Sequence, residues 1–326
     1  MRILVILDPL GDIKTYKDTT YAMMVAADAR GHELYVCEQR ELALEGGQVV
    51  AKQRRLHLTD STGGALDWYR LDPESVSPLA AFDAVLMRKD PPFDMEYVYS
   101  TYMLELAARQ GARVFNDPRA IRDHNEKFSI SEFPQFTAPM IVTRDPVRLR
   151  AFVAEQGEAV FKLLDGMGGA SIFRARSDDP NLSVIIETLN RFGERTVMAQ
   201  RFLPEIADGD KRVLLIGGQV VPYCLARIPK AGEARGNLAA GGTGVARELS
   251  ARDRAIGEAL APVLASRGLL LVGLDVIGTC ITEINVTSPT CFQEIRQQTG
   301  FDVATLFVEA LERAAGAAAP GGRAGS

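Results

Sequence analysis

The sequence predicts a mixed fold: an N-terminal α/β unit with a doubly wound parallel sheet, followed by α+β units. Three observations support this prediction. Short apolar runs alternate with helical segments as far as Asn116. From Ile141 onward, strands and helices mix with glycine-rich turns. The length of 326 residues also suffices for two or three compact units, each with its own core.

The composition is typical of a globular protein and excludes several functional classes. Apolar residues make up 47%, charged residues 24%, and the net charge is −5. This mild acidity argues against a nucleic-acid partner. No apolar run reaches membrane-spanning length, and residues 1–8 are too short for a signal peptide, so we expect a cytoplasmic protein without a membrane partner.

The cysteines indicate neither zinc nor disulfides. None of the four forms a Cys-x-x-Cys pair, and only three histidines are available as further ligands. Reduced thiols in a cytoplasmic protein fit best. The cysteines are Cys37, Cys224, Cys280 and Cys291.

The N-terminal unit begins with a strand–helix–strand pattern. Residues 2–7 form an apolar run, Asp18 can cap a helix over 21–30, and residues 33–38 form a second strand. This order and spacing favour parallel strands. A further strand over 82–87 runs into 88–94. In an open α/β sheet, ligands bind beyond the carboxyl ends of strands, where the loops 8–20 and 88–94 lie.

The middle of the chain predicts a compact α+β unit. A helix over residues 121–133 leads into it. The expected elements that follow are a strand at 141–143, a helix at 146–156, a strand at 159–164, a glycine-rich loop at 165–171, a strand at 172–176, a helix at 182–192 and a strand at 196–201.

The last part predicts a second α+β unit. Gly217-Gly218 joins two apolar runs as a hairpin turn, and Ser250 caps a helix over 250–267. A long glycine-rich loop occupies 228–244, and strands at 268–277 and 282–286 precede a helix at 301–315. We therefore expect domains at 1–122, 123–203 and 204–315, with a disordered tail at 316–326.

The stretch 282–286 carries the first candidate site. As a strand, it directs Glu283 and Asn285 to one face. If the preceding turn centres on Thr279, Asp275 lies opposite Glu283, and facing carboxylates are destabilising unless a cation lies between them. Hard oxygen ligands suit Mg²⁺ held together with nucleotide phosphates. The alternative is an edge strand whose polar side chains face water.

Basic residues suggest a phosphate site. Lys162 lies on a strand that enters the glycine-rich loop 165–171, whose backbone N–H groups can approach phosphate oxygens. A plain hairpin loop is the alternative. Lys127 by itself is typical of a surface helix. Asp210 and Arg212 together are typical of a solvated loop. The glycine loop 228–244 could close over a site as a lid, and its arginines could bind carboxylates.

Five motifs together resemble the bacterial glutathione synthetase family of ATP-grasp ligases. The resemblance runs from Met1 to about Ala315, although Leu163 stands where the family pattern has proline. The motifs are Arg-Lys-Asp-Pro-Pro-Phe-Asp at 88–94, Leu-Asp-Gly-Met-Gly-Gly-Ala-Ser-Ile-Phe-Arg at 164–174, Asp-Gly-Asp-Lys-Arg-Val at 208–213, Ala-Arg-Gly-Asn-Leu-Ala-Ala-Gly-Gly at 234–242 and Thr-Glu-Ile-Asn-Val-Thr-Ser-Pro-Thr-Cys at 282–291.

This resemblance implies an ATP-grasp fold behind an N-terminal pre-ATP-grasp domain. It implies ligation of γ-L-glutamyl-L-cysteine and glycine through an acyl-phosphate, giving glutathione, ADP and phosphate. The implied cofactors are ATP and Mg²⁺, with Mn²⁺ as a second candidate metal. It also suggests a homo-oligomer.

The resemblance further assigns site residues. The implied catalytic residues are Lys162, Arg212 and Arg235. The implied ATP-binding residues are Lys127, Lys162, Asp165, Gly166, Met167, Gly168, Gly169, Ala170, Ser171, Gln200, Arg201, Phe202, Leu203 and Asp210. The implied substrate-binding residues are Lys17, Arg88, Arg227, Asn237, Ser288 and Thr290. The implied metal ligands are Asp275, Glu283 and Asn285.

Two alternatives remain open at this point. Another ATP-grasp carboxylate–amine ligase, such as a D-alanine–D-alanine or amino-acid–peptide ligase, would share the lysines and the metal face. It would differ at residues 88–94 and in the glycine lid. A nucleotide-binding module without catalysis is the second alternative, and the combination of Glu283, Lys162 and Arg212 argues against it.

Overall fold

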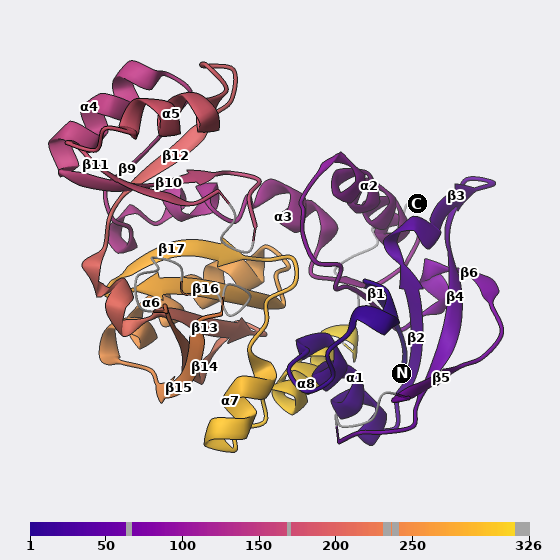
Figure 1. The fold of residues 1–326 in the computed structure, drawn as a ribbon. Helices are drawn as coiled ribbons and strands as arrows, with labels where there is room; N and C mark the ends of the chain where they lie inside the picture. The colour runs from indigo at the N-terminus through magenta and orange to yellow at the C-terminus, as the bar shows by residue number, and fades with distance from the viewer. Residues whose placement is uncertain (63–66, 168–170, 231–235, 237–240, 317–326) are drawn as a thin grey trace, which may run out of the picture.

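The computed structural model describes residues 1–62, 67–167, 171–230, 236 and 241–316, whose strands form three sheets (Figure 1). In the first sheet, β2 and β7 lie on the two sides of β1, and both are parallel to it. Later strands are thus added on both sides of β1, which confirms the predicted doubly wound sheet. Its strand order is β3-β4-β2-β1-β7-β8, with β5 and β6 also paired to β4. The strands are β1 (Arg2–Leu7), β2 (Glu33–Glu38), β3 (Leu42–Glu45), β4 (Gln48–Leu58), β5 (Tyr69–Leu71), β6 (Ser75–Pro78), β7 (Ala84–Met87) and β8 (Val114–Phe115).

Helices cover this sheet, and one of them comes from the far end of the chain. The helices from the N-terminal part are α1 (Thr19–Ala29), α2 (Met95–Arg109) and α3 (Pro118–Asp123). As expected, Asp18 caps α1 by accepting a hydrogen bond from the backbone N–H of Tyr21. Helix α8 (Val303–Gly316) returns to lie beside α1 (Figure 1), so the two ends of the described chain share one core.

The second sheet is a small antiparallel one in the order β11-β10-β12-β9. Helices α4 (Pro146–Gln156) and α5 (Leu182–Asn190) pack on it through Leu149, Phe161 and Ile186. Its strands are β9 (Met140–Thr143), β10 (Glu158–Leu163), β11 (Phe173–Arg176) and β12 (Val197–Arg201). The predicted α+β unit in the middle of the chain is therefore present.

The third sheet is antiparallel in the order β15-β14-β13-β16-β17. Gly217 and Gly218 have φ angles of 57° and 80°, which the predicted hairpin turn requires. Ser250 and Asp253 form a capping box at the start of α6 (Ala251–Ser266). The strands are β13 (Asp210–Ile216), β14 (Gln219–Ile228), β15 (Thr243–Glu248), β16 (Leu271–Ile277) and β17 (Cys280–Asn285), and α7 (Phe292–Thr299) follows.

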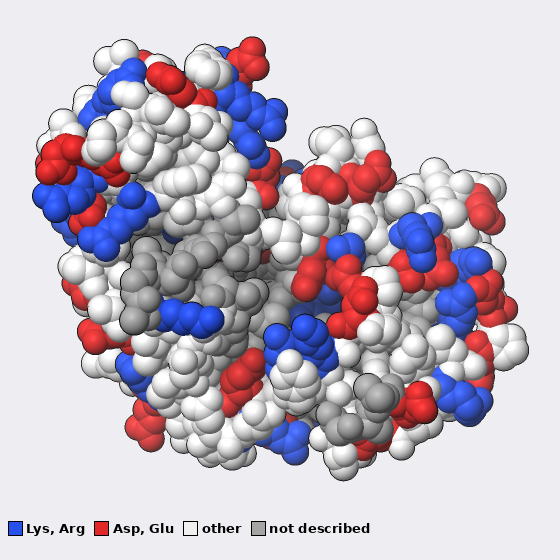
Figure 2. All heavy atoms as spheres, viewed as in Figure 1, with Lys and Arg blue, Asp and Glu red and all other residues white. Residues whose placement is uncertain are grey.

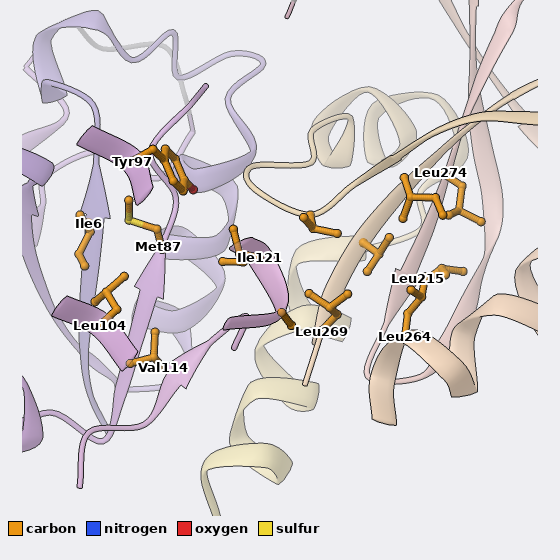
Figure 3. Close-up of a cluster of buried hydrophobic side chains, with 14 of the residues drawn as sticks. Ile6, Met87, Tyr97, Leu104, Val114, Ile121, Leu215, Leu264, Leu269 and Leu274 are labelled. Atoms are coloured by element: carbon orange, nitrogen blue, oxygen red, sulfur yellow. The ribbon is translucent and has the colours of Figure 1, made fainter. Parts of the chain in front are cut away.

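A continuous apolar core joins the first and third sheets (Figure 3). Met87 and Leu104 come from the N-terminal side, Leu274 comes from the third sheet, and Ile121 and Leu269 lie between them. The loops at the carboxyl ends of β1 and β7 are therefore held in a fixed position relative to β16 and β17.

The predicted helix over 121–133 is wrong. Helix α3 ends at Asp123, and a 3-10 helix covers Phe128–Glu132. The Asn125 side chain causes the break, because its Oδ1 accepts hydrogen bonds from the backbone N–H groups of Lys127 (3.2 Å) and Phe128 (2.9 Å). An asparagine side chain that bonds the backbone in this way competes with helical hydrogen bonding.

Two further differences concern elements that the sequence pattern does not reveal. Helix α7 was not predicted, because only Phe292 and Ile295 along it are buried and the apolar period is too sparse. Between β2 and β7 the sequence predicts only a β-hairpin arm over residues 49–58. This arm corresponds to β4, whereas β3, β5 and β6 are not predicted. Within the ranges described, no helix combines the length and apolar character needed to cross a membrane.

Candidate active site

The candidate site is built on the paired strands β16 and β17. Asp275 lies directly opposite Glu283, as the sequence predicts, and Asn285 lies opposite Gly273. The Asn285 Nδ2 donates to the Gly273 carbonyl at 3.2 Å, so its Oδ1 is the atom turned away from that bond. All three predicted oxygen donors line one cavity of about 250 Å³.

Two arginines, one on β13 and one on β14, neutralise Asp275. Arg212 Nε lies 2.7 Å from Asp275 Oδ1, and Arg227 Nη2 lies 2.9 Å from Asp275 Oδ2. Arg227 also bonds Asp210 at 2.5 Å, so one guanidinium bridges two buried carboxylates. Burial acts to raise the pKa of Asp275, but the two arginines outweigh it and hold the pKa well below its usual range. Asp210 and Arg212 are buried on the same face of β13, while Lys211 turns away to Asp253, so the solvated-loop interpretation of Asp210 and Arg212 is wrong.

Two buried lysines converge on Glu283. The Nζ atoms of Lys127 and Lys162 each lie 3.7 Å from Glu283 Oε1. Lys127 also donates to the Gly166 carbonyl at 2.5 Å, which links it to the glycine-rich loop. Its side chain is only 6% exposed, so the surface-helix interpretation of Lys127 is wrong. Both ammonium groups are too far from the carboxylate for a close ion pair, which leaves them able to contact an anion as well.

Glu126 is a buried carboxylate at this site that the sequence reasoning missed. Its Oε1 accepts hydrogen bonds from the backbone N–H groups of Val286 (3.1 Å) and Thr287 (3.3 Å) and from the Thr287 hydroxyl (2.9 Å). It therefore fixes the chain directly after Asn285. Burial raises the pKa of Glu126. No sequence signal distinguishes it, because a glutamate beside a lysine is ordinary on a surface helix.

Asp90 and Pro91 of the N-terminal unit line the cavity, whereas the predicted substrate-binding residue Arg88 does not. Arg88 follows β7 and is buried; its Nε donates to Thr20 Oγ1 at 3.1 Å and its Nη2 donates to the Pro289 carbonyl at 3.0 Å. Ser288 Oγ donates to Asp90 Oδ1 at 2.5 Å. In Figure 2 the surface is hollowed between the two halves of the molecule, and charged side chains gather on the wall formed by the N-terminal half.

The structure brings about half of the predicted site residues together. Those that line the cavity are Lys127, Gly166, Met167, Arg212, Arg227, Asp275, Glu283, Asn285, Ser288 and Thr290. Lys162 and Asp210 join the cluster through the ion pairs above. Gln200 and Leu203 are buried at the end of β12, and no described group pairs with Gln200 Nε2.

Other predicted residues lie apart or cannot be placed. Lys17 is exposed and does not line the cavity. Asp165 binds Arg195 through both carboxylate oxygens, Arg201 is exposed, and the Phe202 ring lies under Arg174. Ser171 is described, with a φ angle of 57°. Gly168, Gly169, Ala170, Arg235 and Asn237 lie outside the described residues, as does nearly all of the predicted disordered tail.

The donor set constrains what the cavity can bind. In the part of the chain that the structure describes, no cluster of three or more His, Cys, Asp or Glu side chains is arranged to hold a metal ion. Two facing carboxylates and an amide oxygen therefore form an incomplete oxygen site, which suits a hard divalent cation that shares its ligands with phosphate. The surrounding lysines and arginines suit the phosphate oxygens themselves.

Solved structures share this architecture. D-cycloserine synthetase DcsG matches with a TM-score of 0.65 and 16% identity, over 96% of this chain and 99% of that chain. The ATP-grasp ligase PsnB, solved with its minimal precursor, Mg and ADP, matches with a TM-score of 0.60 and 19% identity, over 97% and 98%. At these identities the likeness shows the fold.

Sequence comparisons give the family. The prokaryotic glutathione synthetase N-terminal domain matches residues 1–122, and the ATP-grasp domain of the same family matches residues 126–300. The chain belongs to this family and is therefore an ATP-dependent ligase, of a class that uses ATP and divalent metal ions. Glutathione synthetases are similar to it over nearly their whole length: those of Ralstonia nicotianae (64% identity; 98% of each chain) and Vibrio parahaemolyticus (50%; 95% of this chain and 97% of that one).

Proposed function

We propose that this protein joins γ-L-glutamyl-L-cysteine to glycine at the expense of ATP and releases glutathione, ADP and phosphate. The family and its relatives support this substrate pair. The observation that carries the proposal is the convergence of Lys127 and Lys162 on Glu283, opposite the arginine-bound Asp275. This arrangement fits a polyphosphate with its metal ion, held against a carboxylate substrate.

The proposed metal is Mg²⁺, with Mn²⁺ as the alternative, held by Asp275, Glu283 and Asn285 together with phosphate oxygens. Their shared cavity and their oxygen-only chemistry support this assignment. Such an ion would neutralise negative charge on the transferred phosphoryl group. Arg212 and Arg227 each bond one oxygen of the ionised Asp275, so a metal ion would use the remaining lone pairs of this carboxylate.

The proposed nucleotide site extends from the lysines to β12. Lys127 and Lys162 would bind the phosphates, covered by the loop 165–171, and the adenine would lie along residues 200–203 with Asp210 nearby. The buried Nε2 of Gln200 has no hydrogen-bond partner among the described residues, which supports a polar ligand there. Roles for Gly168, Gly169, Ala170 and Arg235 remain proposals from the family resemblance.

The proposed substrate site faces this nucleotide site from the N-terminal unit. Arg88 would bind a substrate carboxylate, with Ser288 and Thr290 as wall residues and Lys17, Arg227 and Asn237 as further contacts. A substrate carboxylate oxygen would attack the terminal phosphorus and displace ADP. The glycine amine would then attack the acyl carbon, lose a proton and displace phosphate. Positioning and charge neutralisation by these side chains account for the catalysis.

The test is phosphate release with each substrate omitted in turn. We expect release to require γ-glutamylcysteine and glycine together for full turnover. Release that ignores γ-glutamylcysteine would contradict the proposal. Substituting D-alanine or a peptide as the acceptor tests the alternative ATP-grasp ligases. A faster reaction with either, in the absence of γ-glutamylcysteine, would favour that alternative.

The remaining proposals concern organisation. We propose functional domains at 1–122, 123–203 and 204–315, in a cytoplasmic homo-oligomer. Light scattering coupled to size-exclusion chromatography measures the assembly directly, and a mass of one chain, 35.5 kDa, would contradict the oligomer.

A further inference from the structure

Helix α7 is tied to the loop that precedes α1, almost the full length of the chain away. Gln293 donates two short hydrogen bonds from one amide nitrogen, to the carbonyls of Thr15 (2.6 Å) and Asp18 (2.7 Å). A glutamine Nε2 has two N–H donors, so these bonds use its full capacity. The side chain therefore closes the loop between residues 15 and 18 against α7.

Two other hydrogen bonds support the same junction. The backbone N–H of Phe292 donates to Thr19 Oγ1 at 3.3 Å, and Gln297 Nε2 donates to the Tyr16 carbonyl at 3.1 Å. Helix α7 begins directly after Thr290 and Cys291, which line the cavity. These hydrogen bonds therefore fix the position of the loop relative to the cavity wall.

Arg88 lies where these two segments meet. Its Nε donates to Thr20 Oγ1, on the loop side, and its Nη2 donates to the Pro289 carbonyl, on the α7 side. The side chain is buried, and no described group pairs with its Nη1. A buried guanidinium nitrogen without a partner is costly unless a ligand supplies the acceptor.

We infer that Gln293 is a positioning residue that holds the two acceptors of Arg88 in place, so that Nη1, which bonds none of the described residues, can bind a carboxylate of the substrate. This inference rests on the proposed function of the site. Gln293 contacts neither substrate nor Arg88. It acts by fixing the distance between the segments that carry Thr20 and Pro289.

The test compares Gln293→Ala with a matched control, Gln110→Ala. Gln110 also bridges two backbone groups, Gly47 O at 2.8 Å and Val49 N at 3.0 Å, but within the N-terminal unit. For Gln293→Ala we expect the KM for γ-glutamylcysteine to rise about tenfold, with kcat and the KM for ATP within about twofold of wild type. Gln110→Ala leaves all three within about twofold.

Conservative variants separate positioning from packing. Gln293→Glu keeps the shape but offers no donor to the two carbonyls, so its KM stays raised. Gln293→Lys keeps a donor for both carbonyls, and we expect the KM to return to within about threefold of wild type. If Gln293→Ala does not fold, Gln297→Ala, which removes one bond to the same loop, is expected to show a smaller rise in the same KM.

A second readout does not depend on turnover. In the ligand-free protein, we expect the amides of residues 14–20 to exchange faster in Gln293→Glu than in wild type or in Gln110→Ala. Faster exchange with an unchanged KM would overturn the inference and leave Gln293 a structural residue. If the wild-type protein does not ligate γ-glutamylcysteine, the proposed function fails, and calorimetric binding of γ-glutamylcysteine to the same variants then decides the role of Gln293. Equal binding of γ-glutamylcysteine by wild type and Gln293→Glu overturns the positioning role of Gln293.

Discussion

Asp275 lies directly opposite Glu283 on the paired strands β16 and β17, yet the two carboxylates are neutralised by different cations. Asp275 has two arginines at 2.7 and 2.9 Å, whereas Glu283 has two lysines, each at 3.7 Å. The arginines form close, buried ion pairs with Asp275, whereas the lysines lie farther from Glu283. We therefore expect the arginines to support the structure and the lysines to exchange partners when phosphate binds.

Glu283→Gln tests the proposed metal anchor. The amide keeps the side-chain volume but removes the charge, so we expect turnover at saturating Mg²⁺ and ATP to fall at least about 100-fold. The variant should stay folded, as judged by circular dichroism. A Mg²⁺ titration of turnover is the measurement, and wild-type activity with an unchanged Mg²⁺ dependence would exclude a metal role for Glu283.

Arg227→Met tests the arginine network. The substitution leaves Asp210 without its cation and removes one of the two cations of Asp275, both in buried positions. Breaking a buried pair by removing one partner costs about 3–5 kcal/mol of unfolding free energy. Urea denaturation measures it, with Arg119→Met as the control because Arg119 pairs with Asp123 on the exposed surface. Equal losses in both variants would contradict the prediction.

Asn116→Ala tests how the first and third sheets are joined. The buried Asn116 amide donates to the carbonyls of Leu271 (2.7 Å) and Val286 (2.9 Å) and accepts from the Leu271 backbone N–H (2.9 Å). Its removal takes away three hydrogen bonds to backbone groups, so we expect a loss of about 2–4 kcal/mol in unfolding free energy, at about 0.5–1.5 kcal/mol for each hydrogen bond. A loss below about 0.5 kcal/mol in urea denaturation would show that water replaces the amide.

Glu312→Gln tests the link between α8 and the N-terminal unit through pH. Hydrogen bonds from Arg30 and His32 lower the pKa of Glu312 from 4.5 to about 2. A carboxylate with a lowered pKa in the folded state stabilises the protein above its ordinary pKa, and the stabilisation is lost as pH falls from about 4.5 toward about 2.

Wild type should therefore exceed Glu312→Gln in stability by about 1 kcal/mol or less at pH 7, because the pair is partly exposed. The difference should shrink as the pH falls below 4. Urea denaturation at pH 7 and pH 3 gives both values. A difference that grows in acid would contradict the lowered pKa of Glu312.

Local patterns account for most of the elements and for one face of the site. The Asp18 and Ser250 caps, the Gly217-Gly218 turn and the pairing of Asp275 with Glu283 all depend on neighbours in sequence or on one hairpin, so their residue types reveal them. Patterns fail where a contact partner is distant. Helix α7 has few apolar positions of its own, and it is anchored by the loop at 15–19.

The sequence by itself determined the fold class, the order of most elements and the pairing of Asp275 with Glu283 on one hairpin, because alternation and capping act over a few residues. The tertiary structure decided which cations meet those carboxylates. The sequence pattern predicts Lys127 as a surface residue. In the structure, the turn at Asn125 interrupts the helix and directs the Lys127 side chain to Glu283. Likewise, the structural roles of Asn116 and Gln293 depend on hydrogen-bond partners more than 150 residues away. Such pairings arise from packing, which no local pattern encodes.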